Sequence, residues 1–245
     1  MPPDIARLIA DYDAGVPVVS HPINIVHALI DGRRVTFCTD MERDPIQRNN
    51  RRGAFYERSD LDAIAKTLPK DATIVDIGAN VGNHSLYFAL FCQAARVIPI
   101  EPNPRAYRLL LHNVLLNGLR DRFDLTRLGV GVSDTAASDF AMEDRERNLG
   151  AAKMIAHGGD IEVHRGDSLL SDVTPDFIKI DVEGMELSVL KGLSGLFDRC
   201  RPGLLVEVDN VNEAAFLAWA ETAGYATAHV FQRYKLNKNY LMHPA

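Results

Sequence analysis

The chain has 245 residues, 47% of them hydrophobic, and a net charge of −6, which suits one α/β domain with an N-terminal extension and argues against a nucleic-acid-binding protein. It contains no apolar run of the roughly 20 residues that a membrane span needs, and its N-terminus lacks a signal-peptide pattern. Its three scattered cysteines predict neither disulfides nor a zinc site, so we expect a cytoplasmic protein.

The N-terminal part differs in pattern from the rest of the chain. Residues 1–58 are expected to form an extension, and residues 59–245 the main domain. Weak apolar periodicity predicts a short helix at the start of the extension. Asp31-Gly32 then separates two strand-like runs, which is typical of a tight β-hairpin turn.

A polar segment with four arginines follows the hairpin. The arginines are Arg43, Arg48, Arg51 and Arg52, within residues 41–53. Such a charged run usually forms a solvated loop or helix. The alternative is a lid that attracts an anionic substrate, such as a phosphorylated or carboxylated compound. The sequence leaves both interpretations open.

Residues 73–85, TIVDIGANVGNHS, combine a short apolar strand that contains Asp76, a glycine turn and the start of a helix. This is the ligand-binding corner of a doubly wound α/β sheet, where Gly78 and Gly82 allow a ligand to approach the backbone closely. Asn80 stands where a dinucleotide fingerprint needs its second glycine, so that interpretation fails. The pattern D-x-G-x-x-x-G instead resembles motif I of the S-adenosylmethionine-dependent methyltransferases.

A second acidic position follows the next predicted strand. Residues 96–100 form a short apolar run that ends in Glu101, 25 residues after Asp76. A carboxylate at the end of a neighbouring parallel strand can accept hydrogen bonds from both hydroxyls of a ribose. The alternative is an exposed acid at a strand end. Asn103 and Pro104 then predict the N-cap and first position of a helix.

Two carboxylates follow a fourth apolar strand. Residues 177–180, FIKI, lead directly into Asp181 and Glu183. Ligands of open α/β sheets bind at the carboxyl ends of the strands, so these acids can orient an acceptor hydroxyl and take its proton. The alternative is that they cap the helix that begins near Met185.

The remaining segments complete an α/β pattern. Residues 143–159 are charged and then rich in small residues, which predicts a loop across the mouth of a site or a disordered segment. Asp167 and Ser168, before a short helical turn, can receive the amino group of an adenine. Further strands are expected at residues 125–132, 202–208, 227–231 and 240–243.

Four stretches together resemble the FkbM-type methyltransferase family. They are GAFYE at 53–57, VDIGANVGNHSL at 75–86, IPIEPNP at 98–104 and FIKIDVEGMELSVLKG at 177–192. The resemblance covers roughly residues 50–210, and NKNYLMHP near the C-terminus is similar to the closing strand of the family. It implies an α/β, Rossmann-like class I methyltransferase fold with a mostly parallel seven-stranded sheet and an antiparallel last strand. It also implies transfer of a methyl group from S-adenosyl-L-methionine to a hydroxyl of a small molecule or sugar.

The resemblance and the positions at the strand ends together point to individual residues, and the catalytic roles among them are hypotheses. Asp181 and Glu183 are the catalytic candidates. The expected cofactor-binding residues are Glu57, Asp76, Gly78, Asn80, Gly82, Asn83, His84, Glu101, Asn103, Asp167, Ser168 and Asp181. The family often has an aromatic residue at the position of His84, so packing or capping is an alternative role there. No metal is expected, since the eight histidines show no metal-binding spacing.

Three other functions are alternatives to methyl transfer by an active enzyme. A nucleotide-dependent oxidoreductase is disfavoured by the missing second glycine and by the lack of a Tyr-x-x-x-Lys pair. A nucleic-acid methyltransferase is disfavoured by the acidic charge and by the absence of an N-P-P-Y motif after the fourth strand. A catalytically silent protein that binds S-adenosylmethionine would carry the same binding motifs, so the sequence leaves it open. The acceptor and the oligomeric state are not predicted.

Overall fold

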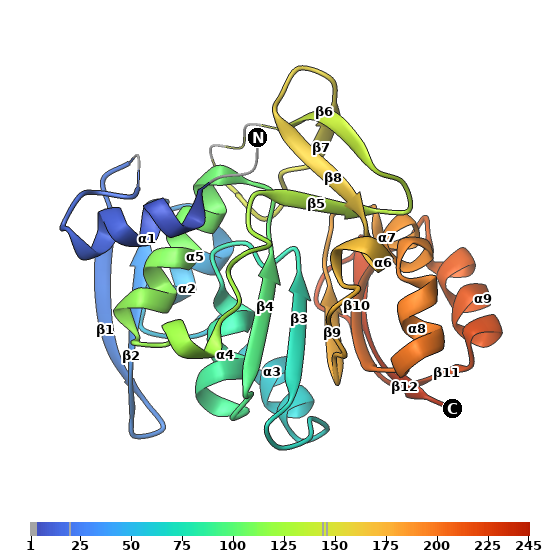
Figure 1. Cartoon of the computed structure of the whole chain (residues 1–245). Coiled ribbons are helices and arrows are strands. Elements are labelled where there is room, and N and C mark those ends of the chain that lie inside the picture. The colour runs from blue at the N-terminus through green and yellow to red at the C-terminus, as the bar shows by residue number, and fades with distance from the viewer. Residues whose placement is uncertain (1–3, 20, 144, 146) are drawn as a thin grey trace.

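A large central sheet organises the protein, which a computed structural model describes at residues 4–19, 21–143, 145 and 147–245. Its strands are β3 (Thr73–Ile77), β4 (Arg96–Ile100), β9 (Phe177–Ile180), β10 (Gly203–Asp209), β11 (Tyr225–Phe231) and β12 (Asn237–Pro244). They follow the order β11-β12-β10-β9-β3-β4, and β12 runs antiparallel to both of its neighbours (Figure 1). The predicted α/β fold with an antiparallel last strand is confirmed.

The strand predicted at residues 125–132 forms only in its last part, as β5 (Val130–Ser133), and it lies outside the large sheet. Before it, the chain runs beside β4 and forms two isolated bridges, Val97 to Phe123 and Glu101 to Leu128. Gly129 then has a φ of 83°, which turns the backbone away from the edge of the sheet. In the part of the chain that the structure describes, the large sheet therefore has six strands instead of the predicted seven.

The diverted chain builds a second sheet, which we call the roof. Its strands are β5 (Val130–Ser133), β6 (Ala137–Met142), β7 (Met154–Ala156) and β8 (Ile161–Arg165), in the order β5-β8-β6-β7. In Figure 1 the roof lies above the carboxyl ends of β3 and β4. It therefore covers the edge of the large sheet at which open α/β folds bind their ligands.

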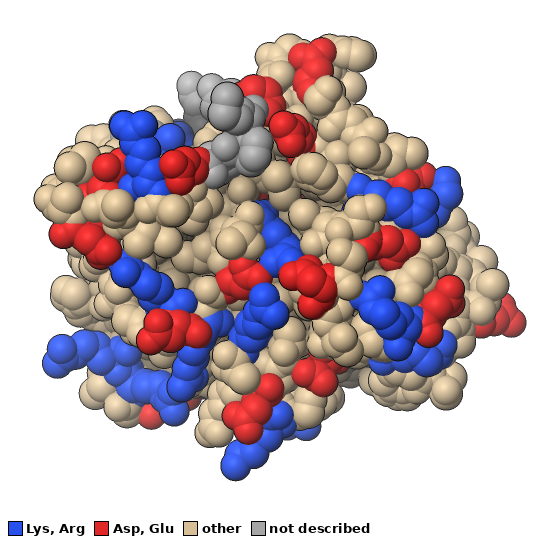
Figure 2. Space-filling model, in the orientation of Figure 1, with Lys and Arg blue, Asp and Glu red and all other residues tan. Residues whose placement is uncertain are grey.

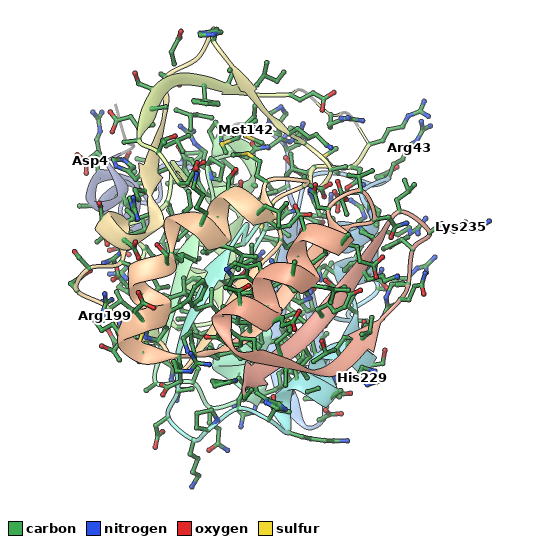
Figure 3. All side chains as sticks on the ribbon, turned by 90° about the vertical axis from the view of Figure 1, so that its right-hand side faces the viewer. Asp4, Arg43, Met142, Arg199, His229 and Lys235 are labelled. Atoms are coloured by element: carbon green, nitrogen blue, oxygen red, sulfur yellow. The ribbon has the colours of Figure 1, made fainter. Side chains whose placement is uncertain are left out.

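Helices cover both faces of the large sheet. They are α1 (Ile5–Asp13), α2 (Pro45–Asn50), α3 (Arg58–Ala65), α4 (Asn83–Phe91), α5 (Pro104–Leu116), α6 (Gly166–Leu169), α7 (Glu186–Gly192), α8 (Ser194–Cys200) and α9 (Glu213–Ala223). One hydrophobic cluster joins Ile74 to α3, α4 and α5, and a second joins Val75 to α7, α8 and α9. Neighbouring residues of one strand thus face different helix layers. Figure 3, viewed from the side of α9, shows side chains filling the space between helices and sheet. None of the described helices is long and apolar enough to cross a membrane.

The predicted hairpin is confirmed as β1 (Asn24–Ile30) and β2 (Arg33–Thr39). Asp31 and Gly32 both have positive φ values, as the tight turn requires. Phe37 of β2 is fully buried and belongs to the same hydrophobic cluster as Ile74 of the large sheet. The hairpin is therefore part of the main core, while a domain boundary near residue 58 stays a prediction.

We expect Phe37→Ala to lower the free energy of unfolding by about 3–5 kcal/mol, because it removes a buried ring that packs edge-on against Phe55. Urea unfolding followed by circular dichroism measures this change. Leu29→Ala, at a side chain 77% exposed on the other strand, should change it by less than about 0.5 kcal/mol. Equally small effects of the two substitutions would contradict a structural role for the hairpin.

Candidate active site

A cavity of about 370 Å³ lies between the roof and the carboxyl edge of the large sheet. This cavity is lined by most of the site residues that were predicted from the sequence: Glu57, Gly78, Asn80, Asn83, His84, Glu101, Asp181 and Glu183. Others from the same set do not belong to the lining: Asp76, Gly82, Asn103, Asp167 and Ser168. The cavity thus joins the glycine turn after β3 to the acids that follow β4 and β9.

The glycine turn has no room for side chains at its two glycines. Gly78 has a φ of 77°, and a Cβ atom there would lie 1.8 Å from the backbone oxygen of Asp181. A Cβ on Gly82 would lie 2.9 Å from Leu110 of α5, so this second glycine serves helix packing. Asn80 lies between them, and its buried Oδ1 has no hydrogen-bond partner within the described chain. Because Asn80 lines the cavity, that oxygen is available to a ligand donor.

A buried ion pair lies directly beneath the turn. Asp76 is fully buried and accepts a hydrogen bond from Ser85 at 2.6 Å. The ammonium of Lys179 lies 3.0 Å from Asp76 and 3.4 Å from Asp181, and it donates to the Gly78 carbonyl at 2.9 Å. Burial alone would lower the pKa of Lys179, but the two carboxylates raise it above its usual value. The sequence proposals missed this lysine, although a charged residue inside the apolar run FIKI is a visible signal.

Glu101 is 6% exposed and lines the cavity next to the turn. Its two carboxyl oxygens accept hydrogen bonds from the backbone N–H groups of Asn80 and Asn103, each at 2.8 Å. Burial raises the pKa of Glu101 to about 7, against the lowering effect of these two N–H groups. Asn103 caps α5 by accepting from the N–H of Arg105, as the sequence predicted.

Glu57 and His84 form a pair at the mouth of the cavity. His84 Nε2 lies 3.3 Å from Glu57 Oε2, and Arg233 Nε lies 3.5 Å from the other carboxyl oxygen. Burial would raise the pKa of Glu57, but His84, Arg233 and Lys179 hold it below its usual value. Asn83 exchanges hydrogen bonds with the backbone of Tyr56 and so fixes this segment to α4.

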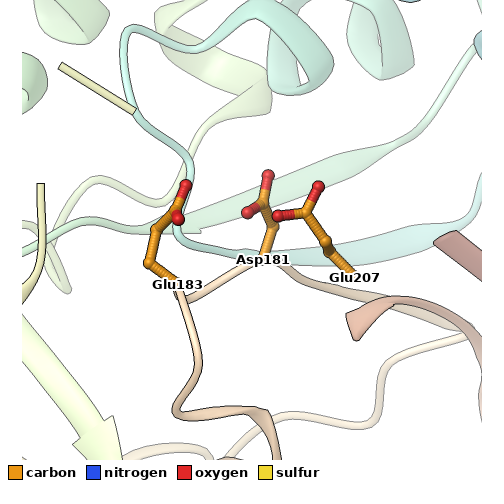
Figure 4. A group of neighbouring side chains, drawn as sticks. All are labelled: Asp181, Glu183 and Glu207. Atoms are coloured by element: carbon orange, nitrogen blue, oxygen red, sulfur yellow. The ribbon is translucent and has the colours of Figure 1, made fainter. Parts of the chain in front are cut away.

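Three carboxylates meet at the ends of β9 and β10. Oxygens of Asp181, Glu183 and Glu207 all lie within 4.8 Å of one another, and Figure 4 shows the three groups turned toward one shared space. Burial, together with the Asp181 charge, raises the pKa of Glu183 to about 7. Burial and the other two acids raise the pKa of Glu207 to about 10. Acidic groups this close are common without an ion, and we assign no metal to them.

The adenine-side role of Asp167 and Ser168 stays a prediction, and these two residues lie outside the lining of the cavity. The carboxylate of Asp167 accepts hydrogen bonds from the N–H groups of Gly195 and Leu196, at 3.1 and 2.8 Å, and so caps the start of α8. Side chains of the roof line the cavity beyond Glu101 instead: Val130, Val132, Met142 and Met154.

The two segments predicted to border the site, residues 41–53 and 143–159, contribute differently to the cavity lining. Pro45 and Ile46 of α2 line the cavity, but the four arginines of residues 41–53 do not. Residues 148–152 line it from the predicted loop 143–159, in which residues 144 and 146 lie outside the described part of the chain. The lining therefore gives no support to an arginine-rich lid for an anionic substrate.

The comparisons with known proteins agree with this geometry. The sequence model described as "Methyltransferase FkbM domain" matches residues 76–234. Methyltransferase sdnD of Sordaria araneosa is 27% identical, over 51% of this chain and 62% of that protein. Hexuronic acid methyltransferase AglP of Haloferax volcanii is 30% identical, over 51% of each chain. The chain thus spans about half to three-fifths of the length of these relatives.

Among solved structures, Streptococcus pneumoniae Sp1610, described as a candidate tRNA (m1A22) methyltransferase, is similar at a TM-score of 0.52 and 13% identity. The similarity covers 78% of this chain and 71% of that one and shows a shared fold. The face in Figure 2 carries interspersed acidic and basic side chains. Nothing in these comparisons supports the exclusion of nucleic acid that the net charge suggested. The family match extends over more than half of the chain and includes the glycine turn, Glu101 and the acids after β9, so the chain belongs to the FkbM methyltransferase family.

Proposed function

We propose that this protein transfers the methyl group of S-adenosyl-L-methionine to a hydroxyl of a small molecule or sugar. The observation that carries the proposal is a single cavity lined by the glycine turn, the acid after β4 and the acids of β9 and β10. Family membership supports methyl transfer. The names of the relatives, one of which is a hexuronic acid methyltransferase, support a small acceptor.

The lining fits this cofactor group by group. Glu101 suits the two ribose hydroxyls, and the turn with the N-terminus of α4 suits the carboxylate of the methionine part. Glu57 carries the negative charge that an ammonium group needs, and Asn80 has a buried oxygen still without a donor. The apolar side chains of Val130 and Met142 suit the adenine ring.

Glu183 is the side chain best suited to take the acceptor proton. The bound cofactor supplies an activated methyl group, so the chain has mainly to orient the acceptor and remove its proton. Because the pKa of Glu183 is about 7, its carboxylate is partly ionised at neutral pH and still basic enough to accept a proton. Asp181 is paired with Lys179 and orients the hydroxyl instead. The hydroxyl proton would pass to Glu183 as the oxygen–methyl bond forms and the sulfur–methyl bond of the donor breaks, which leaves a neutral thioether.

Replacing Glu101 tests whether S-adenosyl-L-methionine binds in this cavity. We expect Glu101→Gln to weaken the binding of S-adenosyl-L-methionine by about 10- to 100-fold, because a neutral amide replaces a charged acceptor of two hydrogen bonds. Isothermal titration calorimetry measures this change. Glu221→Gln, at an exposed position of α9, is the matched control and should bind as the unmodified protein does. Binding of NAD or NADP in place of S-adenosyl-L-methionine would overturn the proposal.

The pH dependence of turnover tests Glu183. A carboxylate base works only when ionised, so turnover should rise with pH through about 7 and level off above it. Glu183→Gln should lower kcat by about 10²- to 10⁴-fold while cofactor affinity is kept. A panel of hydroxylated acceptors with radiolabelled methyl donor provides the assay. Full turnover by this variant would remove Glu183 from the role, and tight cofactor binding without turnover on any acceptor would favour a silent binding protein.

A third substitution separates the cap of α8 from the cofactor site. Asp167→Ala should lower the free energy of unfolding by about 1 kcal/mol, since two N–H groups lose their acceptor. Cofactor affinity should stay unchanged, because the side chain does not line the cavity. Urea unfolding and calorimetry on the same sample measure both quantities. A loss of affinity without a loss of stability would support the adenine-side role.

A further inference from the structure

Lys179 holds an unusual place in the cavity wall. Among the described residues that line the cavity it is the only lysine or arginine, whereas five acids line it: Glu57, Glu101, Asp181, Glu183 and Glu207. The Lys179 side chain is 4% exposed, and its polar contacts are the Gly78 carbonyl and the carboxylates of Asp76 and Asp181. A buried cation in this position acts on four of these acids, Glu57, Glu101, Asp181 and Glu207, since charges interact strongly where water is excluded.

The contacts of Lys179 join the two halves of the site. Its hydrogen bond to the Gly78 carbonyl fixes the turn that borders the proposed cofactor. Its ion pair with Asp181 fixes the first of the acids at the end of β9. The third partner, Asp76, is anchored to α4 through Ser85. One side chain therefore ties together β3, β9 and the start of α4.

Charged groups from several elements surround Lys179. Lys179 faces Asp76 of β3, Asp181 beyond β9 and Glu207 of β10, and its charge also reaches Glu57 and Glu101. The other basic groups near the cavity lower the pKa values of different acids. Arg233 and His84 face Glu57, while Lys153 and Arg145 face Glu183.

We propose that Lys179 is a positioning residue, whose contacts hold the glycine turn against Asp181 and, through the N–H of Asn80 in that turn, hold the Glu101 carboxyl group in place for cofactor binding. This inference rests on the proposed function, because it gives Glu101 the cofactor role stated above. Lys179 itself touches neither reacting group. It acts through Asp181 and Glu101.

Opposite shifts in the titration of Glu101 follow from this arrangement. Lys179 lowers the pKa of Glu101, and Asp76 raises it. Lys179→Met should therefore move the Glu101 titration midpoint up by about one pH unit, and Asp76→Asn should move it down. The double variant should lie near the unmodified protein, since both charges are gone. A merely structural disturbance has no reason to produce shifts of opposite sign.

The experiment is a carboxyl ¹³C NMR titration of protein labelled at glutamate, without added cofactor, with Glu101→Gln to assign the resonance. An unchanged midpoint in Lys179→Met, or a shift in the same direction as in Asp76→Asn, would overturn the proposal. Lys179→Met leaves Asp76 buried and unpaired, which can prevent folding. Asp76→Asn and the double variant, in which neither charge is left alone, then decide the question.

A cofactor readout adds a second test. At pH 7 Lys179→Met should bind S-adenosyl-L-methionine about five- to tenfold more weakly than the unmodified protein, and the difference should close by about pH 9 as Glu101 ionises. A loss of affinity that is the same at both pH values would contradict the electrostatic role. If the unmodified protein does not bind the cofactor, the proposed function fails, whereas the NMR titration still decides whether Lys179 controls Glu101.

Discussion

The close approach between the end of β3 and the end of β9 is the constraint on which the site depends. A hydrogen atom at Gly78 is the largest substituent that the Asp181 carbonyl tolerates, because a Cβ would lie 1.8 Å from that oxygen. This approach brings Lys179 under the turn and lets one ammonium contact the turn and both neighbouring aspartates. The glycine is thus needed for contact between two strand ends as well as for access by a ligand.

The acids around the cavity oppose folding and favour function. Burial and mutual repulsion raise the pKa values of Glu101, Glu183 and Glu207, so ionising them costs free energy in the folded protein. Such groups are retained where their protons or charges are used. Two of them have pKa values near 7, which suits one carboxylate that binds hydroxyls and another that exchanges a proton.

Local sequence signals predicted much of the fold. Contacts that depend on the pairing of distant strands could not be predicted from the sequence. The Asp31-Gly32 turn and the Asn103 cap were correct because each depends on residues close by in the chain. The role of Lys179 depends on the pairing of β9 with β3, about one hundred residues apart, and so it was missed. The capping role of Asp167 was not predicted for the same reason, since its partners lie at Gly195 and Leu196. The acids at the strand ends were found because parallel strands bring those ends to one edge.

The turn at Gly129 makes the large sheet and the roof two separate structural units of the site. Because the chain leaves the edge of β4 here, it adds no further strand to the large sheet and instead forms the separate four-stranded roof. The proposed ribose and methionine contacts then reside on the large sheet, whose geometry is fixed by the core, while the roof and its loop supply the opposite wall, with Val130 and Met142 on the proposed adenine side. Changes in the length of the roof strands and their loop can reshape the acceptor side and leave the proposed ribose and methionine contacts intact. Diversification of substrates among proteins of this design is therefore expected to concentrate between residues 130 and 165.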